Sequence, residues 1–162
     1  MKNEIERKFW LAHLPTACQQ VEPIMLKQGY LAAEPNGSEV RIRKADRTFT
    51  LTVKHGHGLE RLENEIAITQ EQFETLWPST QKRRIHKARF HLSMQNKLIL
   101  EVDQYLEPLK GLVIAEIEFR GIDEAHAFIP PTWLGQEVTD IPLFSNKNLL
   151  RFPTIDDLRK AL

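Results

Sequence analysis

The feature that most constrains the fold is a series of short segments in which charged and apolar side chains alternate. Side chains two residues apart point to the same face of a β-strand, so this period predicts strands with one charged and one apolar face. Near the start of the chain, one such face carries Glu4, Glu6 and Lys8. The opposite face of the same segment carries Ile5 and Phe9. Each charged face therefore requires either water or a charged ligand beside it.

Strand-like segments of this kind recur along the chain and are mostly joined by short turns. They are residues 3–11, 24–32, 39–44, 48–54, 60–68, 82–92, 97–106 and 112–120. Consecutive strands joined by tight turns run antiparallel, and closing the sheet on itself removes its exposed edges. We therefore predict a mainly β (α+β) fold, a closed eight-stranded antiparallel β-barrel with a few surrounding helices. Gly29 is expected to mark a bulge.

Helical spacing replaces the strand period in a few places. A helix is predicted over residues 70–77, with Thr69 as its N-cap and Pro78 as its stop. One or two turns are expected at 123–128, and further helices within 145–162. If the charged faces line the barrel interior, the apolar faces point outward, and we expect these helices to cover them.

Composition narrows the class of ligand and partner. The 22 basic and 22 acidic residues cancel, whereas a general nucleic-acid binder normally has a strong basic excess. Cys18 is the only cysteine, so no disulfide framework or cysteine metal cluster is expected. No secretory leader is evident, and no apolar run approaches the roughly 20 residues of a membrane-spanning helix. We expect residues 1–162 to form one domain of a cytoplasmic monomer or homodimer that binds neither nucleic acid nor membrane.

The charged faces carry pairs of like charge at positions i and i+2. These pairs are Glu4/Glu6, Glu63/Glu65, Glu101/Asp103 and Glu116/Glu118, together with Arg41/Arg43 and Lys87/Arg89. Lys8, Lys54 and Arg61 share these faces. For any single pair, an ordinary solvated face is the simpler interpretation. The whole set favours a compensating ligand, because neighbouring like charges repel and are costly to bury unpaired.

The chemistry of the pairs indicates what that ligand is. Clustered carboxylates are the hard oxygen ligands of Mg²⁺ or Mn²⁺. Clustered Arg and Lys side chains suit phosphate oxygens, Arg through its fork and Lys as a point charge. The sequence therefore predicts a site for a polyphosphate carried with a divalent metal.

Other motifs favour less specific interpretations. His55 and His57 lie among glycines without further ligands nearby, so we expect a mobile loop there. Trp10, Trp77 and Trp133 are better explained by outer packing than by base stacking.

The segment Glu4-Ile5-Glu6-Arg7-Lys8 resembles the N-terminal Glu-x-Glu-x-Lys signature of the CYTH superfamily, the triphosphate tunnel metalloenzymes. The like-charge pairs above and Leu51-Thr52-Val53-Lys54 extend the resemblance over nearly the whole chain. It is closest to the small bacterial members that hydrolyse inorganic tripolyphosphate. It implies an eight-stranded antiparallel barrel with a charged tunnel that binds triphosphates with Mg²⁺ or Mn²⁺.

The resemblance also implies roles for individual residues. The metal ligands would be Glu4, Glu6, Asp103, Glu116 and Glu118. The substrate-binding residues would be Lys8, Lys27, Tyr30, Arg41, Arg43, Lys54, Arg61, Lys87 and Arg89. The catalytic residues would be Glu63, Glu65, Lys87 and Lys54, the two glutamates serving a second metal or a water. Lys147 would be a further tunnel residue, and Arg7, on the opposite face, should lie outside the barrel.

Divalent-metal-dependent hydrolysis of inorganic tripolyphosphate is the leading function on this interpretation. A class IV adenylyl cyclase is an alternative with the same fold and motif, although the tunnel strands offer no evident group to recognise adenine. Thiamine triphosphatase and a non-catalytic polyphosphate-binding module also remain open. The complete set of metal ligands favours catalysis over binding alone.

Overall fold

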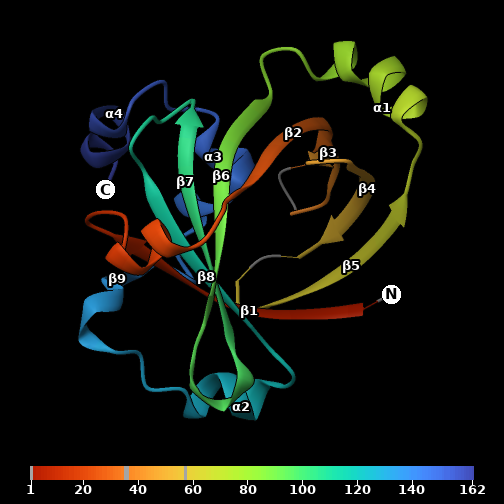
Figure 1. Cartoon of the computed structure of the whole chain (residues 1–162). Coiled ribbons are helices and arrows are strands. Elements are labelled where there is room, and N and C mark those ends of the chain that lie inside the picture. Colours follow the sequence, from red (N-terminus) through yellow and green to blue (C-terminus); the bar gives the residue numbers. More distant parts are fainter. Residues whose placement is uncertain (1, 35–36, 57) are drawn as a thin grey trace.

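The strands form one antiparallel sheet that closes on itself, in a computed structural model that describes residues 2–34, 37–56 and 58–162 (Figure 1). The strands are β1 (Lys2–Leu11), β2 (Ile24–Ala33), β3 (Glu39–Ala45), β4 (Thr48–His55), β5 (Glu60–Ala67), β6 (Arg84–Ser93), β7 (Ile99–Glu107), β8 (Val113–Phe119) and β9 (Gln136–Glu137). Their order is β5-β4-β3-β2-β6-β7-β8-β1-β9, and a further β5–β1 pairing closes the barrel. The predicted eight-stranded barrel is confirmed, with the short β9 as an addition outside the closed ring.

β1 closes the barrel because its two halves pair with different strands. Residues 2–5 pair with β5, and residues 5–11 pair with β8. Beyond the end of β5, β9 takes the free side of β1 opposite Phe9 and Trp10. The charged N-terminal segment is therefore the strand of the barrel that lies between β5 and β8.

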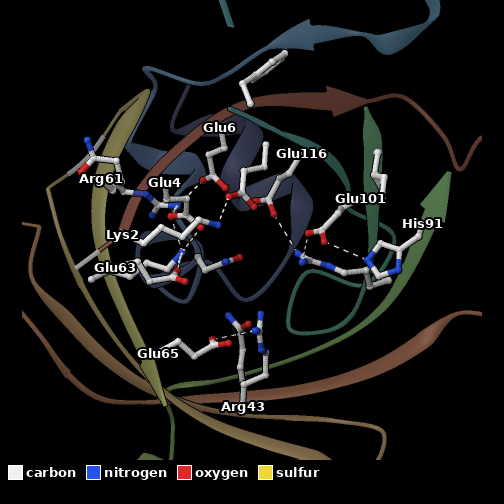
Figure 2. A pocket seen from close by; sticks show the side chains of 18 of the residues that line it. Lys2, Glu4, Glu6, Arg43, Arg61, Glu63, Glu65, His91, Glu101 and Glu116 are labelled. Carbon is white, nitrogen blue, oxygen red and sulfur yellow. Dashed lines mark hydrogen bonds and ion pairs between the residues drawn. The ribbon is translucent and has the colours of Figure 1, made fainter. Parts of the chain in front are cut away.

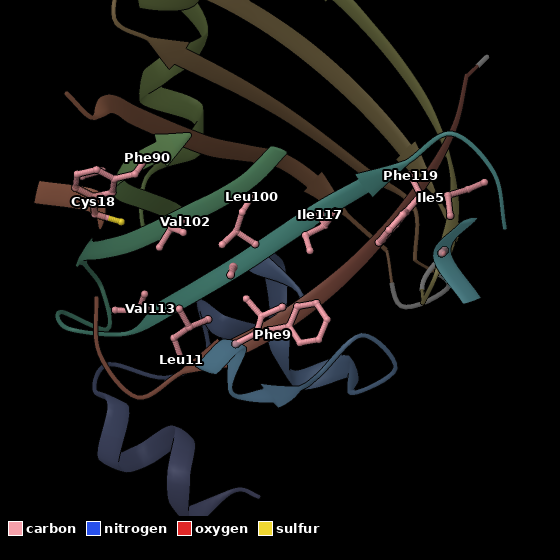
Figure 3. Packing of buried hydrophobic residues seen from close by; sticks show 14 residues of the cluster. Ile5, Phe9, Leu11, Cys18, Phe90, Leu100, Val102, Val113, Ile117 and Phe119 are labelled. Carbon is pink, nitrogen blue, oxygen red and sulfur yellow. The ribbon is translucent and has the colours of Figure 1, made fainter. Parts of the chain in front are cut away.

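The outward faces of β1, β6, β7 and β8 carry the main hydrophobic core (Figure 3). Phe9, Leu100 and Ile117 are fully buried there. The helix α2 (Ile122–Ala127) covers part of this face, where Phe128 packs on Phe119 with ring centroids 5.4 Å apart. The predicted inversion, with charge inside and apolar side chains outside under helices, is confirmed for this half of the barrel.

The helix α1 (Gln70–Leu76) packs on the opposite side, against β3 and β4. Thr69 caps it in a capping box with Gln72, as its position before a helical period predicted. Phe73 anchors the helix by packing on Phe49, with ring centroids 5.3 Å apart. The turn that follows α1 approaches β2 closely, and a Cβ on Gly29 would lie 2.5 Å from the Thr80 side chain.

Close packing therefore accounts for Gly29, and the prediction of a bulge at that residue is wrong. The irregularity in β2 lies between Tyr30 and Ala32 instead. Besides its α-helices, the described part of the chain contains short 3₁₀ turns, namely Thr16–Gln20, Trp77–Thr80, Gln95–Lys97, Thr132–Leu134 and Pro142–Phe144. In the described ranges, no helix has the length and apolar character needed to cross a membrane.

The C-terminal segment closes one end of the barrel, so the prediction that residues 145–162 coat its outside is wrong. The segment contains α3 (Asn146–Leu149) and α4 (Ile155–Lys160). Phe144, Leu149 and Leu158 are buried in a second hydrophobic cluster with inward-facing barrel residues, namely Tyr30, Ile85, Tyr105 and Ile114. At this end of the barrel the inward-facing side chains are apolar instead of charged. The C-terminal segment forms an apolar lid that removes these side chains from water.

Candidate active site

The inward faces of the strands enclose a charged cavity of about 770 Å³ (Figure 2). The glutamates that line it are Glu4, Glu6, Glu39, Glu63, Glu65, Glu101, Glu116 and Glu118. The cations that line it are Lys2, Arg41, Arg43, Lys54, Arg61, Lys87, Arg89, Lys97 and Arg120. Because both signs share one cavity, it can hold a polyanion and a cation together.

One wall of the cavity, formed by β1 and β8, carries two of the four acidic pairs, Glu4/Glu6 and Glu116/Glu118. Glu6 lies directly opposite Glu118 in the register, and Lys8 lies opposite Glu116. The Nζ of Lys8 is 2.9 Å from Glu116 Oε1 and 3.7 Å from Glu6 Oε1. This cation offsets part of the repulsion between the neighbouring carboxylates.

Glu4 and Glu6 are also paired with cations from the adjoining strands. Glu4 accepts from Lys54 Nζ at 2.7 Å and lies 3.0 Å from Arg61 Nη2. Arg61 also bonds to Glu6. In the described part of the chain, no group of three or more Asp, Glu, His or Cys side chains is arranged as a ready-made metal site. These carboxylates instead bind Lys and Arg.

Glu116 shows how the cavity keeps its carboxylates ionised. Burial alone raises the pKa of this carboxyl, but Lys8, Lys87 and Arg89 outweigh it and hold the pKa well below its usual range. Arg89 Nη2 lies 3.0 Å from Glu116 Oε2. A negative oxygen ligand is therefore available at this position at neutral pH.

Asp103 lies behind the cavity wall instead of lining it. Its side chain is 0% exposed, and its carboxylate binds Lys87 Nζ and both Nε and Nη2 of Arg89, the latter two at 2.6 and 2.7 Å. Burial raises its pKa, but Arg89 and Lys87 lower it further, so the carboxyl is ionised. With both oxygens occupied, Asp103 anchors two cations, and its predicted role as a metal ligand does not fit this position.

The wall formed by β5, β4 and β3 continues from β1 through the β5–β1 pairing, and it presents arginines, of which Arg43 and Arg61 are labelled in Figure 2. Arg43 Nη2 lies 3.1 Å from Glu65 Oε2, while Lys54 Nζ lies 2.8 Å from Glu63 Oε2. Burial raises the pKa of Glu63, but Lys54 outweighs it and lowers the pKa.

Three arginines leave donors unused inside the barrel. The Nε groups of Arg41, Arg43 and Arg61 are buried and, among the described residues, have no hydrogen-bond partner. An unpaired buried donor costs about 1–3 kcal/mol. Three such donors around one cavity indicate that an anion belongs there.

Lys27 does not reach the cavity, so its predicted role in substrate binding is wrong. Its side chain is exposed and has the opposite parity from the inward-facing Leu26 and Gln28. Tyr30 does face inward, but it is buried in the second hydrophobic cluster and accepts a hydrogen bond from Gln28 at 3.2 Å. Tyr30 is not among the lining residues of the cavity, but it lies directly opposite the lining residue Arg41 in the register of β2 and β3.

Two lysines with predicted roles in the tunnel, Lys8 and Lys147, line a second, smaller cavity of about 380 Å³. Glu6, Glu39 and Arg61 line both this cavity and the larger one. The Nζ of Lys147 donates to the backbone carbonyl oxygen of Glu34 at 3.2 Å.

Arg7 lies outside the barrel, as predicted. Its guanidinium bonds to Glu137 of β9 and to backbone oxygens beside α2. His55 ends β4, with its Nδ1 2.9 Å from Ser38 Oγ, and His57 lies outside the described residues.

The tryptophans serve packing, partly in unexpected places. Trp10 packs on Phe144, with ring centroids 5.3 Å apart, at the closed end of the barrel. Trp77 stacks on Phe73 on the outside, as predicted, and Trp133 is 53% exposed.

Some lining residues were missed from the sequence. Lys2 and Glu39 share the parity of Glu4 and Arg41, so the alternating pattern could have identified them. Asn146 lines the cavity from the C-terminal segment. The sequence could not identify Asn146 as a lining residue, because its position depends on how the C-terminal segment folds over the barrel.

A closed antiparallel barrel with paired carboxylates and cations inside defines the triphosphate tunnel class, the CYTH superfamily. No family model matches the chain. The inorganic triphosphatase of Nitrosomonas europaea is 40% identical over 146 residues, which cover 90% of this chain and 95% of that protein. The inorganic triphosphatase of Acetivibrio thermocellus is 36% identical over 155 residues, covering 94% and 96%. The chain belongs to the inorganic triphosphatase family.

Solved structures agree with this assignment. The inorganic triphosphatase NE1496 aligns with a TM-score of 0.68 and 38% identity, over 94% of this chain and 98% of that one. The protein HpAC1 from Hippeastrum, at 13% identity and a TM-score of 0.53, shares the fold alone.

Proposed function

We propose that this chain hydrolyses inorganic tripolyphosphate inside the barrel, with Mg²⁺ or Mn²⁺ as cofactor. The relatives named inorganic triphosphatase support the reaction. The observation that carries it for this chain is the set of buried Nε groups on Arg41, Arg43 and Arg61, which have no hydrogen-bond partner among residues 2–34, 37–56 and 58–162. Besides carboxylates, phosphate groups present the paired oxygens that a guanidinium fork matches.

The substrate would lie against one cationic side of the barrel. Arg41 and Arg43 on β3 would bind it together with Lys87 and Arg89 on β6, since only β2 separates these two strands, and the acidic β1 lies across the barrel from them. Asp103 holds Lys87 and Arg89 in place from behind. Pre-positioned cations stabilise charge on the phosphates without reorganising during the reaction.

The metal would be held by the acidic wall. Glu4, Glu6, Glu116 and Glu118 supply only carboxylate oxygens, which fit Mg²⁺ or Mn²⁺. A bound divalent cation would neutralise phosphate oxygens and lower the pKa of a water coordinated to it.

Hydrolysis then requires a water held in line with the terminal phosphorus. Glu63 and Glu65 would orient that water by accepting its hydrogen bonds, and Lys54 keeps Glu63 ionised. The water oxygen bonds to the terminal phosphorus and passes a proton to the carboxylate that orients it, while the bond from that phosphorus to the bridging oxygen breaks. Pyrophosphate leaves with the bonding electrons, and the lysines and arginines stabilise its charge.

The lining favours an inorganic substrate over ATP or thiamine triphosphate. Among the described lining residues, the ring-bearing side chains are His91 and Phe119, and Figure 2 shows that charged groups surround the cavity centre. A nucleobase or thiazolium ring needs a stacking surface.

An assay with matched substrates tests the proposal. The protein is incubated with tripolyphosphate, ATP or thiamine triphosphate, each with Mg²⁺, Mn²⁺ or a chelator, and phosphate and cyclic AMP are measured. We expect metal-dependent phosphate release that is fastest from tripolyphosphate. Cyclic AMP formation would favour a class IV adenylyl cyclase, and faster turnover of thiamine triphosphate would favour a thiamine triphosphatase. Binding without turnover would favour a non-catalytic polyphosphate-binding module.

A further inference from the structure

Asn146 is the residue that the C-terminal segment contributes to the charged cavity. It begins α3, within the segment whose apolar side chains close the inner end of the barrel. Among the described lining residues, no other comes from this segment. The outer end is marked by Lys2 and Glu118, whose side chains are 70% and 53% exposed. Asn146 therefore lies toward the closed end.

Tyr105 fixes the orientation of the Asn146 side chain. The Tyr105 hydroxyl donates a hydrogen bond to Asn146 Oδ1. Tyr105 is itself 2% exposed, and its ring centroid lies 5.5 Å from Lys87 Nζ. Since Oδ1 is used as an acceptor, the two N–H groups on Nδ2 remain as donors. Within the described ranges, nothing accepts from them.

We propose that Asn146 is a further substrate-binding residue, whose Nδ2 donates to the phosphate at the inner end of a bound tripolyphosphate, with Tyr105 as its positioning residue. This inference rests on the proposed function. The walls of the cavity recognise negative charge along the whole polyanion. A neutral donor at the closed end adds recognition of where the phosphate chain stops.

Isosteric substitutions separate the contact with substrate from the contact with Tyr105. Asn146→Leu removes both, Tyr105→Phe removes only the positioning contact, and Asn146→Asp keeps an acceptor for Tyr105 but loses the donor. We expect Asn146→Leu and Asn146→Asp to raise KM for tripolyphosphate about tenfold or more, as expected for a lost hydrogen bond to a charged group. The value of kcat should change less, and Tyr105→Phe should raise KM less than either.

Asn148→Leu is the matched control within the same helix. Asn148 Nδ2 donates to the Pro142 carbonyl oxygen at 2.7 Å and lines the smaller cavity. This variant should lower the melting temperature while leaving KM unchanged. The proposal is overturned if Asn146→Leu leaves KM within about twofold of wild type. It is also overturned if Tyr105→Phe or Asn148→Leu raises KM as much as Asn146→Leu does.

Failure of the proposed function has a different signature. In that case the wild-type chain itself releases no phosphate from tripolyphosphate with either metal. The inference is then tested by calorimetric titration with tripolyphosphate in the presence of a chelator. Weaker binding by Asn146→Leu than by wild type supports it, and equal binding contradicts it.

Discussion

At the scale of single residues, Asp103 supports two of the cations expected to bind substrate. Its buried carboxylate is shared by Lys87 and Arg89. Asp103→Asn keeps the shape but removes the charge, so both cations lose a buried partner. We expect the free energy of unfolding in urea to fall by about 3–5 kcal/mol, and KM for tripolyphosphate to rise.

The neighbouring carboxylate Glu101 provides the control for that change. Glu101 shares Arg89 as a partner, but its side chain is 35% exposed. Glu101→Gln should cost about 1 kcal/mol or less, because exposed ion pairs contribute little. Equal losses of stability in both variants would show that Asp103 has no special supporting role.

Glu6 tests the acidic wall directly. Glu6→Gln retains a hydrogen-bonding side chain but replaces an anionic oxygen ligand with a neutral amide, which binds divalent cations less strongly. We expect metal-dependent phosphate release to fall about 100-fold or more, with the circular dichroism spectrum unchanged. Glu60→Gln, on the outward face of β5, should retain full activity. A fully active Glu6→Gln variant would refute the assignment of Glu6 as a metal ligand.

The sequence could predict those residue roles that follow from the alternation of side chains along a strand. This alternation correctly placed Glu4 and Glu6 inside the barrel and Arg7 outside it. Lys27 was assigned from the resemblance alone, and its side chain faces outward because it alternates with the inward-facing Leu26 and Gln28. Asp103 has the predicted inward parity, but the partners of its oxygens depend on the register of β6 and β7, which a single sequence does not contain.

At the scale of elements, Arg7 joins β1 to β9 and to the end of α2. Its Nε and Nη2 lie 2.8 and 2.6 Å from the two oxygens of Glu137, and its Nη1 lies 2.6 Å from the Phe128 carbonyl oxygen. Arg7→Met removes these bonds while leaving the cavity intact. We expect the melting temperature to fall and kcat per folded molecule to stay the same. A loss of kcat would place Arg7 in the reaction.

The same contact predicts a pH dependence. The hydrogen bond from Arg7 lowers the pKa of Glu137 below its usual value, so this stabilisation is present above the unfolded-state pKa of about 4.3. It is lost as the pH falls through the lower, folded-state pKa. The stability difference between wild type and Arg7→Met should therefore shrink in acid unfolding experiments below about pH 4. A constant difference from pH 7 to pH 3 would contradict the pairing.

Strands and helices were predictable from the sequence where their apolar face can pack on only one surface. Alternation identified the barrel strands, and Thr69 with Pro78 identified α1. The C-terminal segment was misread because its apolar residues fit either surface of the barrel. The position of this segment depends on the inward faces of β6 and β8. Toward one end of the barrel, the charged Lys87 and Glu116 are followed inside by the apolar Ile85 and Ile114, and the C-terminal segment covers this apolar end.

At the scale of the whole molecule, the barrel needs this cover for stability. Phe144 is 1% exposed and packs on Trp10 inside the closed end. Phe144→Ala should lower the free energy of unfolding by about 3–5 kcal/mol, the usual cost of a large core cavity. Ile129→Ala, at a side chain that is 86% exposed, should leave stability nearly unchanged. A similarly small effect for Phe144→Ala would mean that the lid is not part of the cooperative fold.

The barrel should not depend on metal for its fold, in contrast to a domain organised around a structural ion. Glu4, Glu6 and Glu116 all have Lys or Arg partners within the barrel, so removing a cation leaves no carboxylate of this set unpaired. We therefore expect a chelator to abolish phosphate release while leaving the melting temperature within a few degrees of its starting value.

Tripolyphosphate added to the chelated protein should instead raise the melting temperature, because it supplies acceptors for the buried arginine Nε groups that have none within the described part of the chain. At about 100 times its dissociation constant, a ligand stabilises the folded state by about 2.7 kcal/mol. The rise should shrink as salt is added, since screening weakens attraction between the polyanion and the cationic side of the barrel. Unfolding by the chelator alone would show that a bound metal, and not the pairing of opposite charges, holds the barrel closed.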